Sequence, residues 1–165
     1  MRAFTGIPIP NFPLYVEISK DMERLTGKNG KIVSAENLPV TLQFHGEISM
    51  GEAEELWKNM KFPEFKFQVQ GKGISHFPEG TKQARILFIN IFSQELNEIA
   101  FTNHWEQSFH CTLCRLKKPE NINELETKYK GTVFFNFTVE KIVMFSSELT
   151  SSGPIYREVF SHQLI

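Results

Sequence analysis

Residues 109–115 carry the side chains of this chain that are best suited to chemistry. Apolar and polar residues alternate there, which predicts a strand with two different faces. One face would hold Phe109, Cys111 and Leu113, and the other His110, Thr112 and Cys114. The His110 imidazole can transfer a proton near neutral pH, the Thr112 hydroxyl can bond a phosphoryl oxygen, and Arg115 can hold an anion. The segment is therefore a candidate site for proton transfer beside an anion, although the pattern also fits a solvated strand.

A zinc site is an alternative interpretation of the same segment. Cys111 and Cys114 are separated by two residues, and His104 and His110 lie close to them in the sequence. Structural zinc sites use four such ligands. On a strand, however, the two Cys would point to opposite faces, and the chain has no second pair of Cys, which disfavours zinc. The other histidines are interpreted as ordinary polar residues: His76, His104 and His162.

A second segment, residues 39–45, repeats the alternation 71 positions earlier. Its apolar face would hold Val40, Leu42 and Phe44, and its other face Pro39, Thr41, Gln43 and His45. Both segments place a threonine on the face away from the core, followed by a leucine. Thr41 alone would be a surface threonine, and only this pairing makes it a candidate site residue.

On these two segments the chain resembles the 2'-5' RNA ligase family, also called RNA 2',3'-cyclic phosphodiesterases, within the two-histidine phosphoesterase superfamily. That family carries two His-x-Thr-x motifs. The second stands here intact as His110-Cys111-Thr112-Leu113, with the family's arginine at Arg115. The first stands as Pro39-Val40-Thr41-Leu42, so its histidine is missing. The tail, with Gly153-Pro154-x-Tyr156, adds to a resemblance that covers nearly the whole chain.

The resemblance implies an α+β fold of two pseudo-symmetric lobes. Each lobe would be an antiparallel sheet backed by helices, and the two motif strands would face each other across a cleft. Residues 1–165 would then form a single bilobal domain.

The resemblance also implies a reaction without metal, ATP or any other cofactor. A terminal 2',3'-cyclic phosphate on RNA or a nucleotide would be opened to a 2'-phosphate, and the reverse reaction would join a 5'-hydroxyl in a 2'-5' linkage. In the implied reaction, His110 is the catalytic base and Arg115 clamps the phosphate. Thr112 and Thr41 hold the phosphate oxygens, and Tyr156 contacts the phosphate. The Tyr156 ring is equally compatible with a place in the core.

Position 39 should hold the acid of this reaction, but proline has no side-chain proton to give. His45 is predicted on the same face, yet six strand residues separate the two positions by roughly 20 Å. His45 therefore cannot simply replace the missing histidine. The chain is either an impaired enzyme, an enzyme with a substitute acid, or a non-catalytic module that binds a nucleotide or an RNA end.

The rest of the chain must supply the elements that position these strands. Strands are predicted near residues 2–8, 31–34, 65–73, 133–139, 141–149 and 155–164, with clear alternation within 65–69 and 133–139. An apolar run predicts another strand at 84–91. A helix is predicted after Asn11 from the apolar spacing of Leu14, Ile18, Met22 and Leu25. Ser49 and Glu52 fit a capping box, Ser93 fits an N-cap, and Pro119 could open a further helix. Helices mixed with hairpin-like strands indicate an α+β class with antiparallel sheets.

Composition limits the classes of function. A chain of 165 residues with a net charge of −1 suits one domain and gives no overall basic field for nucleic acid. No apolar run approaches the roughly 20 residues of a membrane span. The first residues lack the apolar region of a signal peptide, and two Cys do not suggest a disulfide framework. We therefore expect a cytoplasmic monomer that does not bind membranes.

Overall fold

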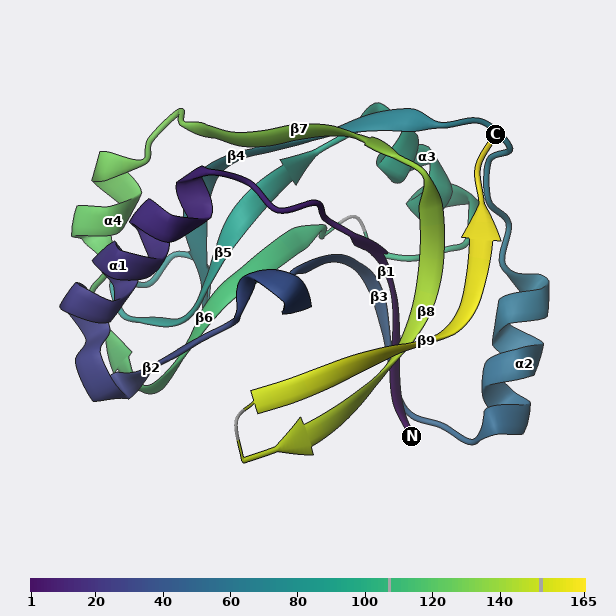
Figure 1. Cartoon of the computed structure of the whole chain (residues 1–165), viewed down its shortest axis with the longest axis horizontal. Coiled ribbons are helices and arrows are strands. Elements are labelled where there is room, and N and C mark those ends of the chain that lie inside the picture. The colour runs from purple at the N-terminus through teal and green to yellow at the C-terminus, as the bar shows by residue number, and fades with distance from the viewer. Residues whose placement is uncertain (107, 152) are drawn as a thin grey trace.

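Nine strands dominate the computed structural model, which describes residues 1–106, 108–151 and 153–165 (Figure 1). The strands are β1 (Arg2–Pro8), β2 (Gly30–Ile32), β3 (Pro39–Glu47), β4 (Phe67–Phe77), β5 (Ala84–Phe92), β6 (His110–Glu120), β7 (Val133–Val139), β8 (Lys141–Thr150) and β9 (Gly153–Gln163). The helices are α1 (Leu14–Thr26), α2 (Met50–Asn59), α3 (Gln94–Thr102) and α4 (Asn123–Lys128), with short 3-10 turns η1 (Gly27–Asn29) and η2 (Ala35–Asn37).

All the strands join one sheet in the order β7-β4-β5-β6-β3-β1-β8-β9, and β2 pairs with β6. Each pairing between the described strands is antiparallel. The predicted α+β class with antiparallel pairing is therefore confirmed. The division into two lobes stays a prediction, because strands of both halves of the chain belong to the same continuous sheet.

The two motif strands are neighbours at the middle of this sheet. β3 and β6 pair through a single register position in the described chain, Thr41 opposite His110. On one side of this junction lie β3, β1, β8 and β9, and on the other lie β6, β5, β4 and β7. Because the two strands separate on leaving this pair, side chains near it can line a hollow between the two halves of the sheet.

The helices begin and end where local signals favour it. The Ser49 hydroxyl accepts from the backbone N–H of Glu52, and the Glu52 side chain accepts from the backbone N–H of Ser49, which is the predicted capping box of α2. Ser93 caps α3 through the backbone N–H of Leu96, as predicted. Figure 1 shows α1 and α4 together at one end of the molecule and α2 and α3 at the other.

The main core lies between α1, α4 and the sheet. Ile18 and Met22 of α1 are fully buried, and they pack into one apolar cluster with Leu87, Leu113 and Leu125. Removing each such side chain from water stabilises the fold by about 1.5–3 kcal/mol. The helix periodicity predicted from the sequence is thereby confirmed.

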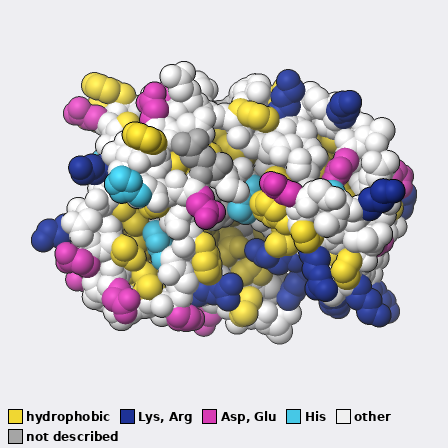
Figure 2. Space-filling model, turned by 180° about the vertical axis from the view of Figure 1, so that it is seen from behind, with side chains coloured by type: hydrophobic (Ala, Val, Ile, Leu, Met, Phe, Trp, Pro, Cys, Tyr) yellow, Lys and Arg dark blue, Asp and Glu magenta, His cyan; other side chains and the backbone are white. Residues whose placement is uncertain are grey.

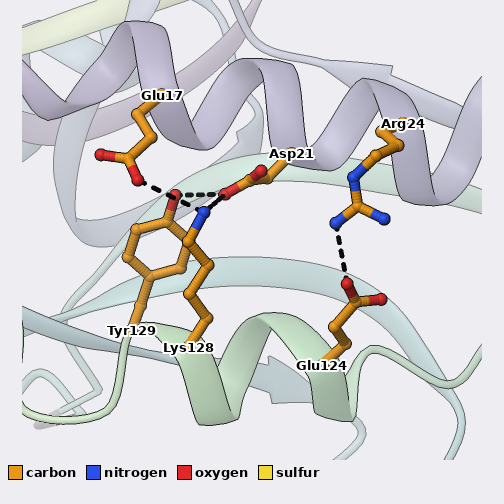
Figure 3. A network of polar contacts seen from close by, with 6 residues as sticks. All are labelled: Glu17, Asp21, Arg24, Glu124, Lys128 and Tyr129. Atoms are coloured by element: carbon orange, nitrogen blue, oxygen red, sulfur yellow. Dashed lines mark hydrogen bonds and ion pairs between the residues drawn. The ribbon is translucent and has the colours of Figure 1, made fainter.

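Ion pairs hold α1 against α4 at the surface above this core (Figure 3). The Lys128 ammonium lies 2.6 Å from an Asp21 carboxylate oxygen, and the Tyr129 hydroxyl donates to the same oxygen. Arg24 of α1 pairs with Glu124 of α4 at 2.8 Å. The hydrogen bond from Lys128 lowers the pKa of Asp21, so the carboxylate contributes to the stability of the fold while it is ionised.

Two local predictions were wrong and one was shifted. α1 has Pro13 rather than Asn11 at its N-cap position, and no side chain caps it. The short strand predicted at residues 31–34 is present as β2, but it covers Gly30–Ile32. Pro119 lies inside β6 and does not open a helix; it stands near the strand end, where a missing donor costs little.

No helix in the described part of the chain is long and apolar enough to cross a membrane.

Candidate active site

An irregular register in β6 gathers His110, Thr112 and Arg115 on one side of the sheet. In the pairing with β5, Thr112 lies opposite Phe88 and Cys114 lies opposite Leu87, so Leu113 is an extra residue on β6. Such a bulge shifts the alternation by one position. Leu113 and Cys114 are therefore both buried in the core, while Arg115 returns to the side of Thr112. The prediction that Cys114 shares the face of His110 was wrong for this reason.

Two similar irregularities in β3 change the predicted faces there. In the pairing with β1, Leu42 and His45 are the extra residues. Thr41 and Phe44 consequently line the same hollow, and Phe44 is 49% exposed instead of buried. His45 points to the other side, where its Nε2 lies 2.8 Å from the Thr5 hydroxyl. The prediction that His45 shares the face of Pro39 was therefore wrong, and this contact removes His45 as a substitute for the missing histidine.

The hollow is a cavity of about 370 Å³ at the junction of β3 and β6. All of the site residues expected from the sequence line it: Pro39, Thr41, His110, Thr112, Arg115 and Tyr156. Pro39 is the first residue of β3 and lies opposite Pro8 of β1, and the register continues regularly to Thr41. The proline therefore leaves the motif strand in place, and what it removes is the imidazole.

The charge of the cavity lining is positive. Arg2 from β1 and Lys31 from β2 line it together with Arg115, whose cross-strand partner is Lys31. No Asp or Glu is among the described residues that line it. Figure 2 shows Lys and Arg side chains gathered beside a hollow with an apolar floor on this side of the molecule. Three cations without a carboxylate suit an anion such as a phosphate.

His110 is oriented by its surroundings. Its Nδ1 lies 3.1 Å from the backbone carbonyl oxygen of Ser108, and that carbonyl can only accept, so Nδ1 carries the proton. The Nε2 lone pair is then free to accept a proton. The rings of Phe77 and Phe88 meet the imidazole edge-on at 5.4 and 5.5 Å. Burial lowers the pKa of His110 below its ordinary value, and the positive charge of Arg115 lowers it further. The hydrogen bond to the Ser108 carbonyl raises this pKa but does not offset burial.

Tyr156 lines the cavity from β9, in the half of the sheet that does not contain β6. Its ring packs edge-on against Phe4 at 5.1 Å, and Phe4 stacks on Phe145. Burial raises the pKa of Tyr156, while Arg115 and Arg2 oppose that shift. Among the described residues its hydroxyl has no hydrogen-bond partner in the protein. Tyr156 therefore has a packed ring and an available phenolic proton in a positively charged cavity.

The rim of the cavity is tied together by polar contacts. The Asn37 side-chain amide of η2 donates to the Pro154 carbonyl of β9 at 3.1 Å and to the Ser34 hydroxyl at 3.2 Å. The Tyr15 hydroxyl donates to the Val33 carbonyl at 2.6 Å. The Asn37 contact fixes the segment between β2 and β3 against the β8–β9 hairpin, and the Tyr15 contact fixes it against α1, so the cavity has a defined wall on this side.

The zinc alternative is not supported by the geometry. Cys111 and Cys114 are both buried in the apolar cluster that contains Leu113. Burial raises the pKa of both thiols, that of Cys114 to about 11. Metal-binding Cys must be deprotonated, which this environment opposes. No group of three or more potential ligand residues is found among the described residues.

The remaining histidines lie outside the cavity lining. His76 forms an ion pair with Glu126, and its Nε2 lies 2.7 Å from the Thr81 carbonyl. His162 contacts the Pro63 carbonyl. These contacts agree with the interpretation of His76 and His162 as ordinary polar residues.

Two basic residues of the cavity were not identified as site residues by the sequence analysis. Arg2 and Lys31 are basic residues on strands, a pattern too common to indicate a site. What makes them site residues is pairing: β1 lies against β3, and β2 against β6. No local signal in the sequence contains that information.

No family model matches the chain. Several curated relatives do. It is 35% identical over 150 residues to the RNA 2',3'-cyclic phosphodiesterase of Aquifex aeolicus, covering 79% of each chain. It is 30% identical over 173 residues to the protein of the same name from Methanocaldococcus jannaschii, covering 96% of this chain and 98% of the relative.

Solved structures share the fold. A Thermus thermophilus protein superposes with a TM-score of 0.76 at 22% identity, covering 99% of this chain and 98% of the other. Escherichia coli LigT in complex with 3'-AMP superposes with a TM-score of 0.70 at 17% identity, covering 99% and 97%.

Proposed function

We propose a function from one premise, that the chain belongs to the RNA 2',3'-cyclic phosphodiesterase family. The protein opens a terminal 2',3'-cyclic phosphate, on RNA or on a nucleotide, to a 2'-phosphate. The same groups run in reverse join a 5'-hydroxyl to the cyclic phosphate without ATP, which gives a 2'-5' linkage. The 3'-AMP in the related LigT structure supports a nucleotide as the ligand of this cavity.

The observation that carries this proposal is the shared lining of one positive cavity. His110 and Thr112 come from β6 and Thr41 from β3, and Arg115 stands beside them. A base, hydroxyl donors and a guanidinium within one cavity are what attack on a phosphodiester requires. Charge that grows on the non-bridging oxygens would be met by donors already in place.

In this mechanism His110 accepts a proton from water as the water attacks phosphorus. Its Nδ1–H is held by the Ser108 carbonyl, so Nε2 is the accepting atom. Thr112, Thr41 and Arg115 hold the phosphate oxygens. Attack and departure are roughly in line, so the departing 3' oxygen needs its proton from the side opposite His110.

Pro39 stands where the family places the acid, and it gives no proton. Loss of one general acid typically costs about 10²–10⁴ in rate. The proline at position 39 therefore favours a second candidate function, a non-catalytic module that binds a nucleotide or an RNA end in the same cavity. The two candidates differ in turnover, not in the ligand.

A hydrolysis assay separates them. The purified protein is incubated with a nucleoside 2',3'-cyclic phosphate, and the products are resolved so that the 2'- and 3'-phosphates are distinguished. Slow release of the 2'-phosphate that is lost in His110→Ala supports the enzyme. Saturable binding of the nucleotide without product, in both the unchanged protein and Pro39→His, supports the binding module.

The reverse reaction has its own test. An oligonucleotide with a 2',3'-cyclic phosphate end and one with a 5'-hydroxyl are incubated together without ATP, and a 2'-5' linkage is identified by its resistance to ribonucleases specific for 3'-5' bonds. A cytoplasmic location, a monomeric state and a single domain over residues 1–165 stay predictions.

A further inference from the structure

The missing histidine leaves one half of the sheet without an obvious proton donor. His110 reaches the cavity from β6, and the donor must approach from the other side of the β3–β6 junction, where Pro39 stands. That half consists of β3, β1, β8 and β9. The question is which side chain on those strands carries a proton that it can release.

Four described side chains on that half line the cavity and carry an exchangeable proton: Arg2, Thr41, Ser147 and Tyr156. A guanidinium does not lose its proton in proteins, and aliphatic hydroxyls are much weaker acids than a phenol. Tyrosine, with an ordinary pKa of about 10, is the strongest usable acid of the four. Lys31 also lines the cavity, but it belongs to β2, which pairs with β6 on the His110 side.

The position of Tyr156 suits a group opposite His110. β9 and β6 are separated by three strands in the sheet, a distance of roughly 19 Å along a flat sheet. Both nevertheless line one cavity of about 370 Å³, so the curl of the sheet brings Tyr156 to this cavity from the half of the sheet that does not contain His110. The Tyr156 ring is fixed by Phe4, and its hydroxyl is unpartnered among the described residues.

We propose that Tyr156 is the proton donor of this active site, in place of the histidine that Pro39 replaces; this rests on the function proposed above. The Nε2 of His110 takes a proton from water as the water oxygen bonds to phosphorus. The bond from phosphorus to the 3' oxygen breaks, and that oxygen takes its electron pair and the Tyr156 phenolic proton. The phenolate is reprotonated by solvent, His110 returns its proton to solvent, and the product carries a 2'-phosphate.

A double-mutant cycle tests this role. Hydrolysis of a nucleoside 2',3'-cyclic phosphate is measured for the unchanged protein, Tyr156→Phe, Pro39→His and Pro39→His with Tyr156→Phe. We expect Tyr156→Phe to lower kcat about 10²-fold with little change in KM when residue 39 is proline. With histidine at position 39 the same change should cost less than about 3-fold, because the imidazole then supplies the proton.

Some outcomes would overturn the role of Tyr156 without overturning the proposed hydrolysis, and one outcome would overturn both. A Tyr156→Phe protein as active as the unchanged one, or equal losses in both backgrounds, would show that Tyr156 is not the donor while hydrolysis stands. Absence of hydrolysis in all four proteins would overturn both proposals. Tyr129→Phe is the matched control, since it removes a phenol at the α1–α4 contact.

The pH profile of kcat provides a second test, which can exclude Tyr156 even if Tyr156→Phe fails to fold. The titratable and charged groups that act on the phenol are Arg115 of β6 and Arg2 of β1, which lower its pKa, and the buried Cys111 thiol, which raises it. A tyrosine donor stays protonated to about pH 10, so the unchanged protein should show no alkaline decline below that pH. Pro39→His should introduce a decline near neutral pH. A decline near neutral pH in the unchanged protein would exclude Tyr156.

Discussion

Thr41 of β3 and His110 of β6 lie directly opposite each other, and in the described chain this is the one register pair that joins the two motif strands. It also joins the two halves of the sheet. Two of the expected site residues therefore stand at the point where the halves meet. A change in the angle between β3 and β6 would move the hydroxyl relative to the imidazole, which ties the geometry of the site to that of the whole sheet.

Replacing Pro39 by histidine should raise the hydrolysis rate of a nucleoside 2',3'-cyclic phosphate by about 10²-fold, with little effect on binding. The residue is at the start of β3 in a regular register with Pro8, so the new imidazole would enter the cavity without moving Thr41. Steady-state kinetics measures kcat and KM for both proteins. Adding His110→Ala should abolish the gain, and a folded Pro39→His protein with no gain would contradict this prediction.

Removing the guanidinium of Arg115 should weaken binding of a nucleoside 2'-phosphate about 10- to 100-fold, because charge-assisted hydrogen bonds are lost. The affinity of the unchanged protein should fall as salt rises, and Arg115→Ala should reduce that dependence. Calorimetric titration at two or more salt concentrations provides both quantities. Arg85→Ala, an exposed arginine of β5 outside the cavity lining, is the control; equal effects of the two changes would argue against a specific clamp.

The activity should depend on His110 being neutral. Because burial lowers its pKa, kcat/KM should rise with pH through a midpoint below the ordinary histidine value of about 6.5 and then level off. A profile from pH 4.5 to 8 measures this midpoint. A midpoint clearly above 6.5 would mean that another group titrates, or that His110 is held in its charged form.

Changing Asp21 to asparagine should lower the free energy of unfolding at pH 7 by about 1–2 kcal/mol, since Lys128 and Tyr129 lose an ionised partner. The hydrogen bond from Lys128 lowers the folded-state pKa of Asp21, so its contribution is present above the unfolded value of about 3.9 and is lost as pH falls through the lower folded value. Denaturant unfolding at pH 7 and at pH 2.5 should therefore show a larger difference at the higher pH. Glu54→Gln, on the exposed side of α2, serves as the reference, and an equal loss at both pH values would refute the electrostatic origin.

The sequence by itself determined the features that depend on neighbouring residues. The capping box of Ser49 and Glu52, the apolar face of Ile18 and Met22, and the strands themselves follow from spacing and residue type. The two motifs, and the absence of a histidine at position 39, could also be found in the sequence. These signals are local, so no tertiary contact was needed to recognise them.

Only the tertiary structure decided which side chains share the cavity. Extra residues at Leu42 and Leu113 shift the alternation of β3 and β6, which turns Phe44 and Arg115 toward the cavity. Strict alternation could not predict this, because a bulge is defined by the partner strand. Curling of the sheet brings Tyr156 to the same cavity as His110, and pairing of β1 and β2 adds Arg2 and Lys31. These positions depend on contacts between residues far apart in the chain, where no local pattern of residues specifies the partner.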